Sequence, residues 1–303
     1  MFMGTPEFAV ASLDALLQAG YHVVAVITAP NRPAGRGMKL SESAVKKYAL
    51  EKGLKILQPV KLKDPDFLNE LKSLNADLQV VVAFRMLPEV VWNMPPMGTI
   101  NVHGSLLPQY RGAAPINWAI INGEKETGVT TFKLQHEIDT GNILLQKAIA
   151  IREDETAGEL HDRMKDIGAA LLVDTLKKME EGGIEETVQS KIMDGTIQLK
   201  HAPKIFTDTC RIDWNKPVDE IYNLIRGLSP YPGAFMLLGD KTIKIFSAKK
   251  IVTSPSIPPG AYKTDGKNVL RFAAQDGYIE VLELQLEGKK KMMVDAFLRG
   301  YKV

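Results

Sequence analysis

The chain has 303 residues, of which 45% are hydrophobic and 24% charged; this is the composition of a folded globular protein and not of a disordered, collagen-like or coiled-coil chain. The formal net charge of +2 gives no overall basic field for nucleic acid, and the single cysteine, Cys210, excludes an intramolecular disulfide and a multi-thiolate metal site. The apolar runs are far shorter than a membrane-spanning helix needs, and the N-terminus does not resemble a signal or transit peptide. We therefore expect a cytoplasmic protein with no membrane association.

The first half of the chain alternates short apolar runs with amphipathic segments, which is typical of βαβ units around a mostly parallel sheet. Thr5 is the expected N-cap of the first helix, and Pro6 its first helical residue. The expected strands cover residues 21–28, 78–84 and 99–103, and the expected helices cover residues 6–18, 43–52 and 65–74.

Two further strands and a long helix follow, at residues 127–134, 143–151 and 156–181. The pair Gly182-Gly183 ends this helix, and from residue 206 the chain changes to short β-rich runs between Pro and Gly turns, as in a small barrel. The predicted domains are an N-terminal α/β domain at 1–183, a linker at 184–205 and a small β domain at 206–303.

Charge differs between the two parts of the chain. Residues 206–303 contain 15 Lys and Arg against 11 Asp and Glu, whereas residues 1–205 contain 23 against 25. The excess in the C-terminal part fits an ordinary solvated surface with a lysine-rich turn at residues 289–291, and it also fits a surface that contacts phosphates.

The run Asn-Val-His-Gly-Ser-Leu-Leu-Pro at residues 101–108 contains the strongest candidates for chemistry. Alternate residues of a strand share a face, so Asn101 and His103 should project in the same direction from the end of one strand. An amide donor beside an imidazole suits acyl-group chemistry, in which the amide stabilises an oxyanion and the imidazole moves protons. A hydrogen-bonded polar pair in the core is the alternative interpretation.

A catalytic imidazole usually needs a carboxylate to orient it, and Asp139 is the candidate. It lies in Asp139-Thr140-Gly141, after a predicted strand. This tripeptide is equally typical of a turn in which the aspartate bonds its own backbone.

Residues 30–39 form a basic loop with exposed glycines, in which Arg32, Arg36 and Lys39 could contact phosphates. A solvated surface loop is the alternative, and the spacing matches neither a P-loop nor a dinucleotide fingerprint. The five histidines contain no metal-binding pair, so no metal is expected, and Cys210 is expected to be inert.

Taken together, these motifs resemble the methionyl-tRNA formyltransferases. The resemblance rests on residues 3–8, 32–37, 101–115, 139–141, 212–214 and 229–234, and so covers nearly the whole chain. The Asn, His and Asp with Ser-Leu-Leu-Pro are shared by folate-dependent formyltransferases in general, whereas the Arg-Pro-Ala-Gly-Arg-Gly loop and the C-terminal motifs indicate the acceptor.

The resemblance implies a Rossmann-like catalytic domain followed by an OB-like barrel that binds tRNA. It also implies transfer of a formyl group from 10-formyltetrahydrofolate to initiator Met-tRNA, without a metal. We expect a monomer. By position, Asn101, His103 and Asp139 match the catalytic residues, and Arg36 matches the arginine that meets the tRNA acceptor end. The residues matched to the folate site are Ser105, Leu106, Leu107, Pro108, Phe84 and Leu87.

The chain departs from the family pattern at Ala-Phe-Arg-Met-Leu-Pro, residues 83–88, on the pterin side of the folate site. Many members have there an Ala-Tyr-Gly-type segment that is one residue longer. Two other functions fit part of the pattern. A formyltransferase acting on an amino-sugar nucleotide would share Asn101, His103 and Asp139 but would not need the Arg36 loop. A tRNA-binding module with a vestigial formyltransferase fold would not need the three catalytic residues.

Overall fold

The computed structural model describes residues 1–34, 39–192 and 198–301. The chain divides into two compact units, each assembled from several segments. The first comprises Met1–Arg111, Gly128–Ile149 and His161–Lys200, and the second comprises Gly112–Thr127, Ala150–Leu160 and His201–Val303. The domain limits expected from the sequence remain a prediction. Over the described ranges, no helix has the length and apolar character needed to cross a membrane.

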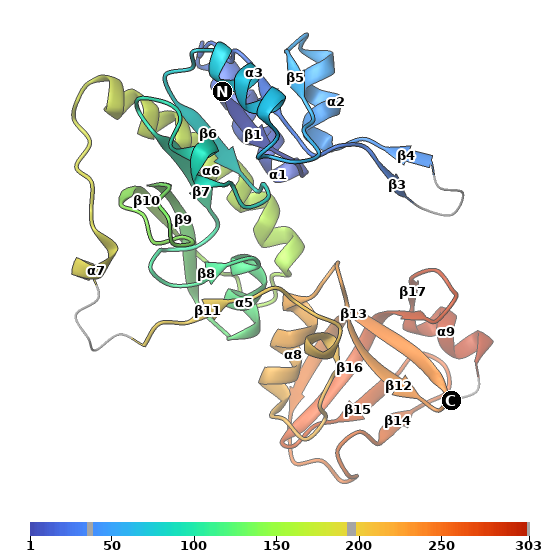
Figure 1. The fold of residues 1–303 in the computed structure, drawn as a ribbon. Helices are drawn as coiled ribbons and strands as arrows, with labels where there is room; N and C mark the ends of the chain where they lie inside the picture. The colour runs from blue at the N-terminus through green and yellow to red at the C-terminus, as the bar shows by residue number, and fades with distance from the viewer. Residues whose placement is uncertain (35–38, 193–197, 302–303) are drawn as a thin grey trace. The chain divides into compact units, whose positions relative to one another are not determined.

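Within the described part of the first unit, seven strands form one sheet (Figure 1). Their spatial order is β10 (Ile143–Ala150), β9 (Glu126–Lys133), β7 (Thr99–His103), β6 (Gln79–Val82), β1 (Phe2–Gly4), β2 (Val26–Ile27) and β5 (Ile56–Leu57). Strands β5, β2, β1, β6 and β7 are neighbours in that order, and each pairs with the next in parallel. Strand β9 runs antiparallel to β7. The expected mostly parallel, Rossmann-like sheet is confirmed.

Helices cover both faces of this sheet, which is why its central strands are apolar on both sides. They are α1 (Glu7–Gln18), α2 (Ala44–Glu51), α3 (Pro65–Ser73), α4 (Glu89–Trp92) and α6 (Ala157–Glu180). Met3 and Val81 pack in one cluster with Phe67 of α3 and Val91 of α4. On the opposite face, Gly168 of α6 approaches Val102. Side chains therefore alternate between two different helical layers along each strand.

Helix starts differ in how they are capped. Ser43 caps α2 by accepting a hydrogen bond from the Lys46 amide at 3.0 Å, and Asp64 caps α3 in the same way. The prediction for α1 was wrong, because its N-cap is Pro6 and not Thr5, and no side chain caps it.

The strand expected over residues 21–28 is shorter in the structure, where β2 covers Val26–Ile27. Strand β1, with which it pairs, contains only three residues.

The order of the strands places a topological switch between β1 and β6. From β1 the chain goes to β2 and β5 on one side and returns to β6 and β7 on the other. Open α/β sheets bind ligands outside the carboxyl ends of their strands at such a switch. The loops after β1, β2, β6 and β7 are thus the expected position of a site.

The basic loop predicted at residues 30–39 begins and ends in an antiparallel ribbon. Strand β3 (Arg32–Ala34) pairs with β4 (Lys39–Ser41), with Arg32 opposite Ser41. Arg36, at the tip, lies outside the described residues.

The second unit is built on an antiparallel sheet with the order β12 (Ala234–Leu238), β13 (Lys241–Val252), β16 (Gly277–Leu286), β15 (Leu270–Ala273) and β14 (Tyr262–Thr264), with β17 (Met292–Met293) beside β16. It also contains α5 (Pro115–Ile121), the 3-10 turn η1 (Asp208–Cys210), α8 (Val218–Gly227) and α9 (Val294–Gly300). Strands β8 (Arg111–Gly112) and β11 (His201–Ala202) form a separate small pair.

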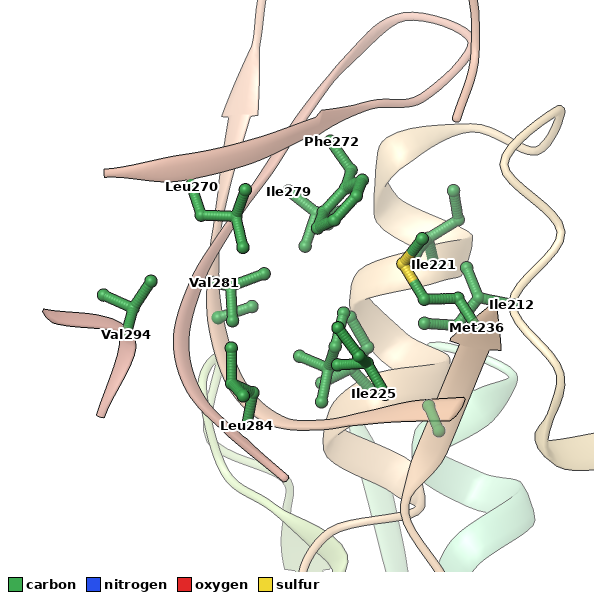
Figure 2. Packing of buried hydrophobic residues seen from close by; sticks show 14 of the residues in the cluster. Ile212, Ile221, Ile225, Met236, Leu270, Phe272, Ile279, Val281, Leu284 and Val294 are labelled. Carbon is green, nitrogen blue, oxygen red and sulfur yellow. The ribbon is translucent and has the colours of Figure 1, made fainter. Parts of the chain in front are cut away.

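The core of this unit lies between α8 and the concave side of its sheet (Figure 2). Ile221 and Ile225 of α8 lie in one cluster with Met236 of β12. Phe272 of β15 and Ile279 of β16 belong to the same cluster. The β-rich C-terminal domain expected from the sequence is therefore present as a curved antiparallel sheet with a helix over its apolar face.

Candidate active site

Asn101 and His103 share a face of β7, as the strand period predicts. Asn101 is in register with Val81 on one side and Phe132 on the other, and His103 is the last residue of the strand. Because Val81 faces the layer of α3 and α4, both polar side chains project to that face at the carboxyl end of the strand. Asn101 is half-buried, and its side-chain amide makes no hydrogen bond to any described residue.

Both ring nitrogens of His103 face oxygen atoms. Nε2 lies 2.9 Å from the Tyr110 carbonyl oxygen and Nδ1 lies 3.8 Å from Oδ2 of Asp139. A carbonyl can only accept, so Nε2 carries a hydrogen and donates a hydrogen bond to the Tyr110 carbonyl oxygen. The 3.8 Å separation is an ion-pair distance and not a hydrogen bond, so the carboxylate acts on the ring through its charge. The structure thus brings together the three residues predicted for catalysis.

Asp139 is held by its backbone. Its residue is 9% exposed and has a φ of 55°. Nε2 of Gln189 donates to the carbonyl oxygens of Asp139 at 2.9 Å and Gly141 at 2.8 Å. The guanidinium of Arg111 donates to Oε1 of the same glutamine through Nε at 3.0 Å and a terminal nitrogen at 2.6 Å. Gln189 therefore connects Arg111 to the loop that carries the carboxylate.

Sequence reasoning did not find Gln189. It is the first residue of α7 (Gln189–Ile192), inside the segment predicted as a linker, and it is 1% exposed. Burial lowers the pKa of the Arg111 guanidinium, and the nearby charge of Asp139 acts against that shift. The same segment supports Tyr110, whose amide donates to the Lys200 carbonyl at 2.7 Å. A buried polar residue in an otherwise polar segment gives no periodic signal.

Strained backbone angles occur in the loops that carry the residues of the predicted site. Among the described residues other than glycine, positive φ angles occur at Ala83 (47°), Tyr110 (58°) and Asp139 (55°), besides Asn75 in the turn after α3. Such angles are costly for residues with a Cβ atom and gather at functional sites. Ala83 follows β6 and Tyr110 lies in the loop after β7, whereas Asp139 lies in the loop after the antiparallel β9, which brings its carboxylate to His103.

The segment predicted to contact folate is fixed by a small polar network. Thr130 Oγ1 donates to the Ser105 carbonyl at 2.6 Å and accepts from the Leu107 amide at 3.1 Å, while Gln146 donates to the Leu107 carbonyl at 2.8 Å. Ser105, Leu107 and Pro108 are buried, so Leu106 is the residue of the four whose side chain is partly exposed. The segment is a rigid wall beside His103.

A cavity of about 520 Å³ lies elsewhere on the same edge, at the β1–β6 switch. Its walls come from the loops after β1, β2 and β6 and from residues 41–43, and they include Arg32, Phe84 and Arg85. Leu87, also predicted at the folate site, is buried in the core cluster that contains residues of α3 and α4. Arg32 is exposed, whereas only the backbone of Lys39 is described.

Comparison with known proteins identifies the family. Residues 1–176 match the formyl transferase model and residues 204–302 match the formyl transferase C-terminal domain. The methionyl-tRNA formyltransferase of Bacteroides fragilis is 52% identical over 306 residues, covering 99% of this chain and 94% of that protein. The enzyme of the same name from Flavobacterium johnsoniae is 54% identical, covering 99% and 95%. The chain belongs to the methionyl-tRNA formyltransferase family.

A solved structure agrees on the fold of this formyltransferase. The N-formyltransferase from Helicobacter canadensis, crystallised with folinic acid and dTDP-3-aminofucose, superposes with a TM-score of 0.69 over 96% of this chain and 98% of that one. Its sequence identity is 22%, so the likeness concerns the fold alone. The resemblance inferred from the sequence motifs is confirmed at the level of family and fold.

Proposed function

We propose that this formyltransferase moves the formyl group of 10-formyltetrahydrofolate to the α-amino group of methionine on initiator Met-tRNA. The product is N-formylmethionyl-tRNA, which serves translation initiation. The observation that carries the proposal is the match, above 50% identity and over nearly the full length of both chains, to relatives named for this reaction. Because charged tRNA is the substrate, we expect the enzyme to work in the cytoplasm. We also expect it to be a monomer.

The chemistry begins with attack of the neutral amine on the formyl carbon, which leaves a negative charge on the formyl oxygen. Asn101 is suited to donate its side-chain amide to that oxygen, because no described residue takes up the amide's hydrogen-bonding capacity. The amide is carried by a central strand of the sheet, so it is in place before the charge develops.

His103 and Asp139 are proposed to manage the proton. The amine must lose a proton and the folate nitrogen must gain one. Since Nε2 of His103 is held by the Tyr110 carbonyl, Nδ1 is the nitrogen that exchanges protons. The Asp139 carboxylate, 3.8 Å from Nδ1, favours the cationic ring that forms during transfer.

The donor and the acceptor are proposed to approach along different walls. The folate would lie against Ser105, Leu106, Leu107 and Pro108, with Phe84 and Leu87 on the pterin side, and no metal is required. The tRNA would be held by Arg32, Arg36 and Lys39 and by the more basic domain at 206–303, with the catalytic domain at 1–183 and a linker at 184–205.

The proposal is tested by incubating purified protein and 10-formyltetrahydrofolate with Met-charged initiator tRNA, Met-charged elongator tRNA or an amino-sugar nucleotide. Rapid product with the initiator tRNA, and much slower product with the other two, is the expected result. Product with the sugar nucleotide alone would retain formyl transfer but overturn the acceptor, and binding of tRNA with no product from any acceptor would overturn the catalytic assignment.

A further inference from the structure

Among the residues that the structure describes, two arginines line the cavity at the β1–β6 switch, and neither has an acidic partner. Arg32 and Arg85 both line it, and neither makes an ion pair with any described residue. Its one acidic lining residue, Glu42, is already neutralised by Lys46, whose Nζ lies 2.7 Å from Oε1. That hydrogen bond lowers the pKa of Glu42. The walls therefore present two uncompensated positive charges to the same space.

Arg85 is fixed in this position. Its terminal nitrogens donate to the carbonyl oxygens of Val60, at 2.8 Å, and Pro59. Its Nε is buried and has no hydrogen-bond partner among the described residues. Burial lowers the pKa of the Arg85 guanidinium, and the like charge of Arg32 lowers it further. Holding two cations in one cavity costs free energy unless an anion enters it.

The rest of the wall is also suited to an anion. Thr5 and Pro6 line the cavity at the start of α1, a twelve-residue helix without a side-chain cap. The amides and dipole of such a helix end favour negative charge. The N-terminus of α1 therefore supplements the two arginines, which supply most of the positive charge.

We propose that the Arg32–Arg85 cavity binds a phosphate group of the acceptor, a phosphodiester near the 3′ end of the tRNA. The inference rests on the proposed function and names two contacts for its acceptor. A carboxylate of the folate donor has related chemistry. The phosphate is favoured because Arg32 lies at the base of the ribbon predicted to meet tRNA. In addition, of the six residues predicted at the folate site, Phe84 alone lines this cavity.

Arg85 also lies in the segment where the chain departs from the Ala-Tyr-Gly pattern of many relatives. A contact made by Arg85 would thus distinguish this enzyme from members that have no arginine there. The conservative substitution Arg85→Lys retains the charge but loses the guanidinium geometry, so it should restore part of the effect.

The test measures equilibrium binding of uncharged initiator tRNA over a range of KCl concentrations, with no catalysis required. Arg85→Gln and Arg32→Gln should each weaken binding by about tenfold or more. Each should also reduce the slope of log affinity against log salt by about 0.7–0.9, the contribution of one phosphate contact. If both arginines hold one phosphate, the double variant should lose less than the two single losses combined.

Matched controls separate binding from folding. Lys72→Gln removes one positive charge from α3, outside the cavity, and should leave the salt slope unchanged. Arg85→Gln could loosen the 59–60 segment, so Arg32→Gln, whose side chain makes no described hydrogen bond, is the second variant. Binding of folinic acid by all variants should equal that of the wild type.

Unchanged tRNA binding and salt slope in both arginine variants would overturn the inference. Weakened folinic acid binding with normal tRNA binding would also overturn it, because the anion would then be a donor carboxylate. A wild-type protein that shows the predicted salt slopes but forms no formylated tRNA would overturn the proposed function while supporting the phosphate site.

Discussion

Two regions on the carboxyl edge of one sheet differ in construction. At the end of β7, His103 and Asp139 are 7% and 9% exposed, and hydrogen bonds fix the ring and the loop that carries the carboxylate. At the β1–β6 switch, by contrast, the cavity is lined by an exposed arginine, a half-buried one and hydroxyl side chains. The first region has the rigidity that bond making needs, and the second has the charge that binding needs. The sheet thus supports chemistry and recognition by different physical means.

The largest effect is expected at the end of β7. Asn101→Ala and His103→Ala should each lower kcat by about 10²- to 10³-fold, because each removes a group that stabilises the transition state. Steady-state kinetics with Met-charged initiator tRNA measures the loss, and thermal unfolding should show that both variants fold. Asn93→Ala, the same change at an exposed position, is the control. Near-normal turnover in either catalytic variant would remove that residue from the mechanism.

A smaller loss is expected when the support of this region is removed. Gln189→Leu retains the side-chain volume but abolishes the bonds to Asp139, Gly141 and Arg111, so kcat should fall by about 10- to 100-fold through misplacement of the carboxylate. The KM for folate should change little. Gln198→Leu makes the same substitution at an exposed side chain of the same segment and should be silent. Equal losses in both variants would indicate a general effect on the segment.

A substitution in the basic loop at residues 30–39, which is predicted to contact tRNA, should change KM and not kcat. Arg36→Ala is expected to raise the KM for tRNA by about tenfold, the value of one charge-assisted contact, while folate binding stays intact. Titration of each substrate at saturating concentrations of the other measures both parameters. A change confined to the folate KM would assign the loop to the donor.

The smallest effect concerns the wall of the cavity as a folded structure. Ser43 caps α2 and its hydroxyl also bonds Thr28 Oγ1 at 2.7 Å. Ser43→Ala should therefore lower the free energy of unfolding by about 1 kcal/mol. Urea denaturation checks the value, and an unchanged midpoint would show that the cap contributes nothing to stability.

Local rules predicted the parts of the fold that depend on local patterns. The strand period placed Asn101 and His103 on one face, and β7 occupies the expected residues 99–103. Periodicity also located α2 and α3 to within a residue or two. It overestimated β2, because the length of a strand depends on its partner, and it misassigned the N-cap of α1.

Long-range contacts explain what local patterns could not predict. The support of Asp139 comes from Gln189, 50 residues away, and that of Gln189 from Arg111, 78 residues away. Tyr110 contributes a backbone carbonyl, which any residue could offer. The pairing of Arg32 with Arg85 in one cavity similarly depends on which strand ends the sheet brings together. No spacing along the chain encodes these contacts.

The most direct test of the two-region account is the single-turnover rate of formyl transfer from 10-formyltetrahydrofolate to Met-charged initiator tRNA. It is measured over a range of enzyme concentrations, up to saturation of the tRNA, for Asn101→Ala and Arg85→Gln. The account predicts a slow rate for Asn101→Ala at every enzyme concentration. For Arg85→Gln it predicts a rate that reaches the wild-type value once the tRNA is saturated. A full rate in Asn101→Ala, or a rate in Arg85→Gln that stays slow at saturation, would contradict the division between chemistry and recognition.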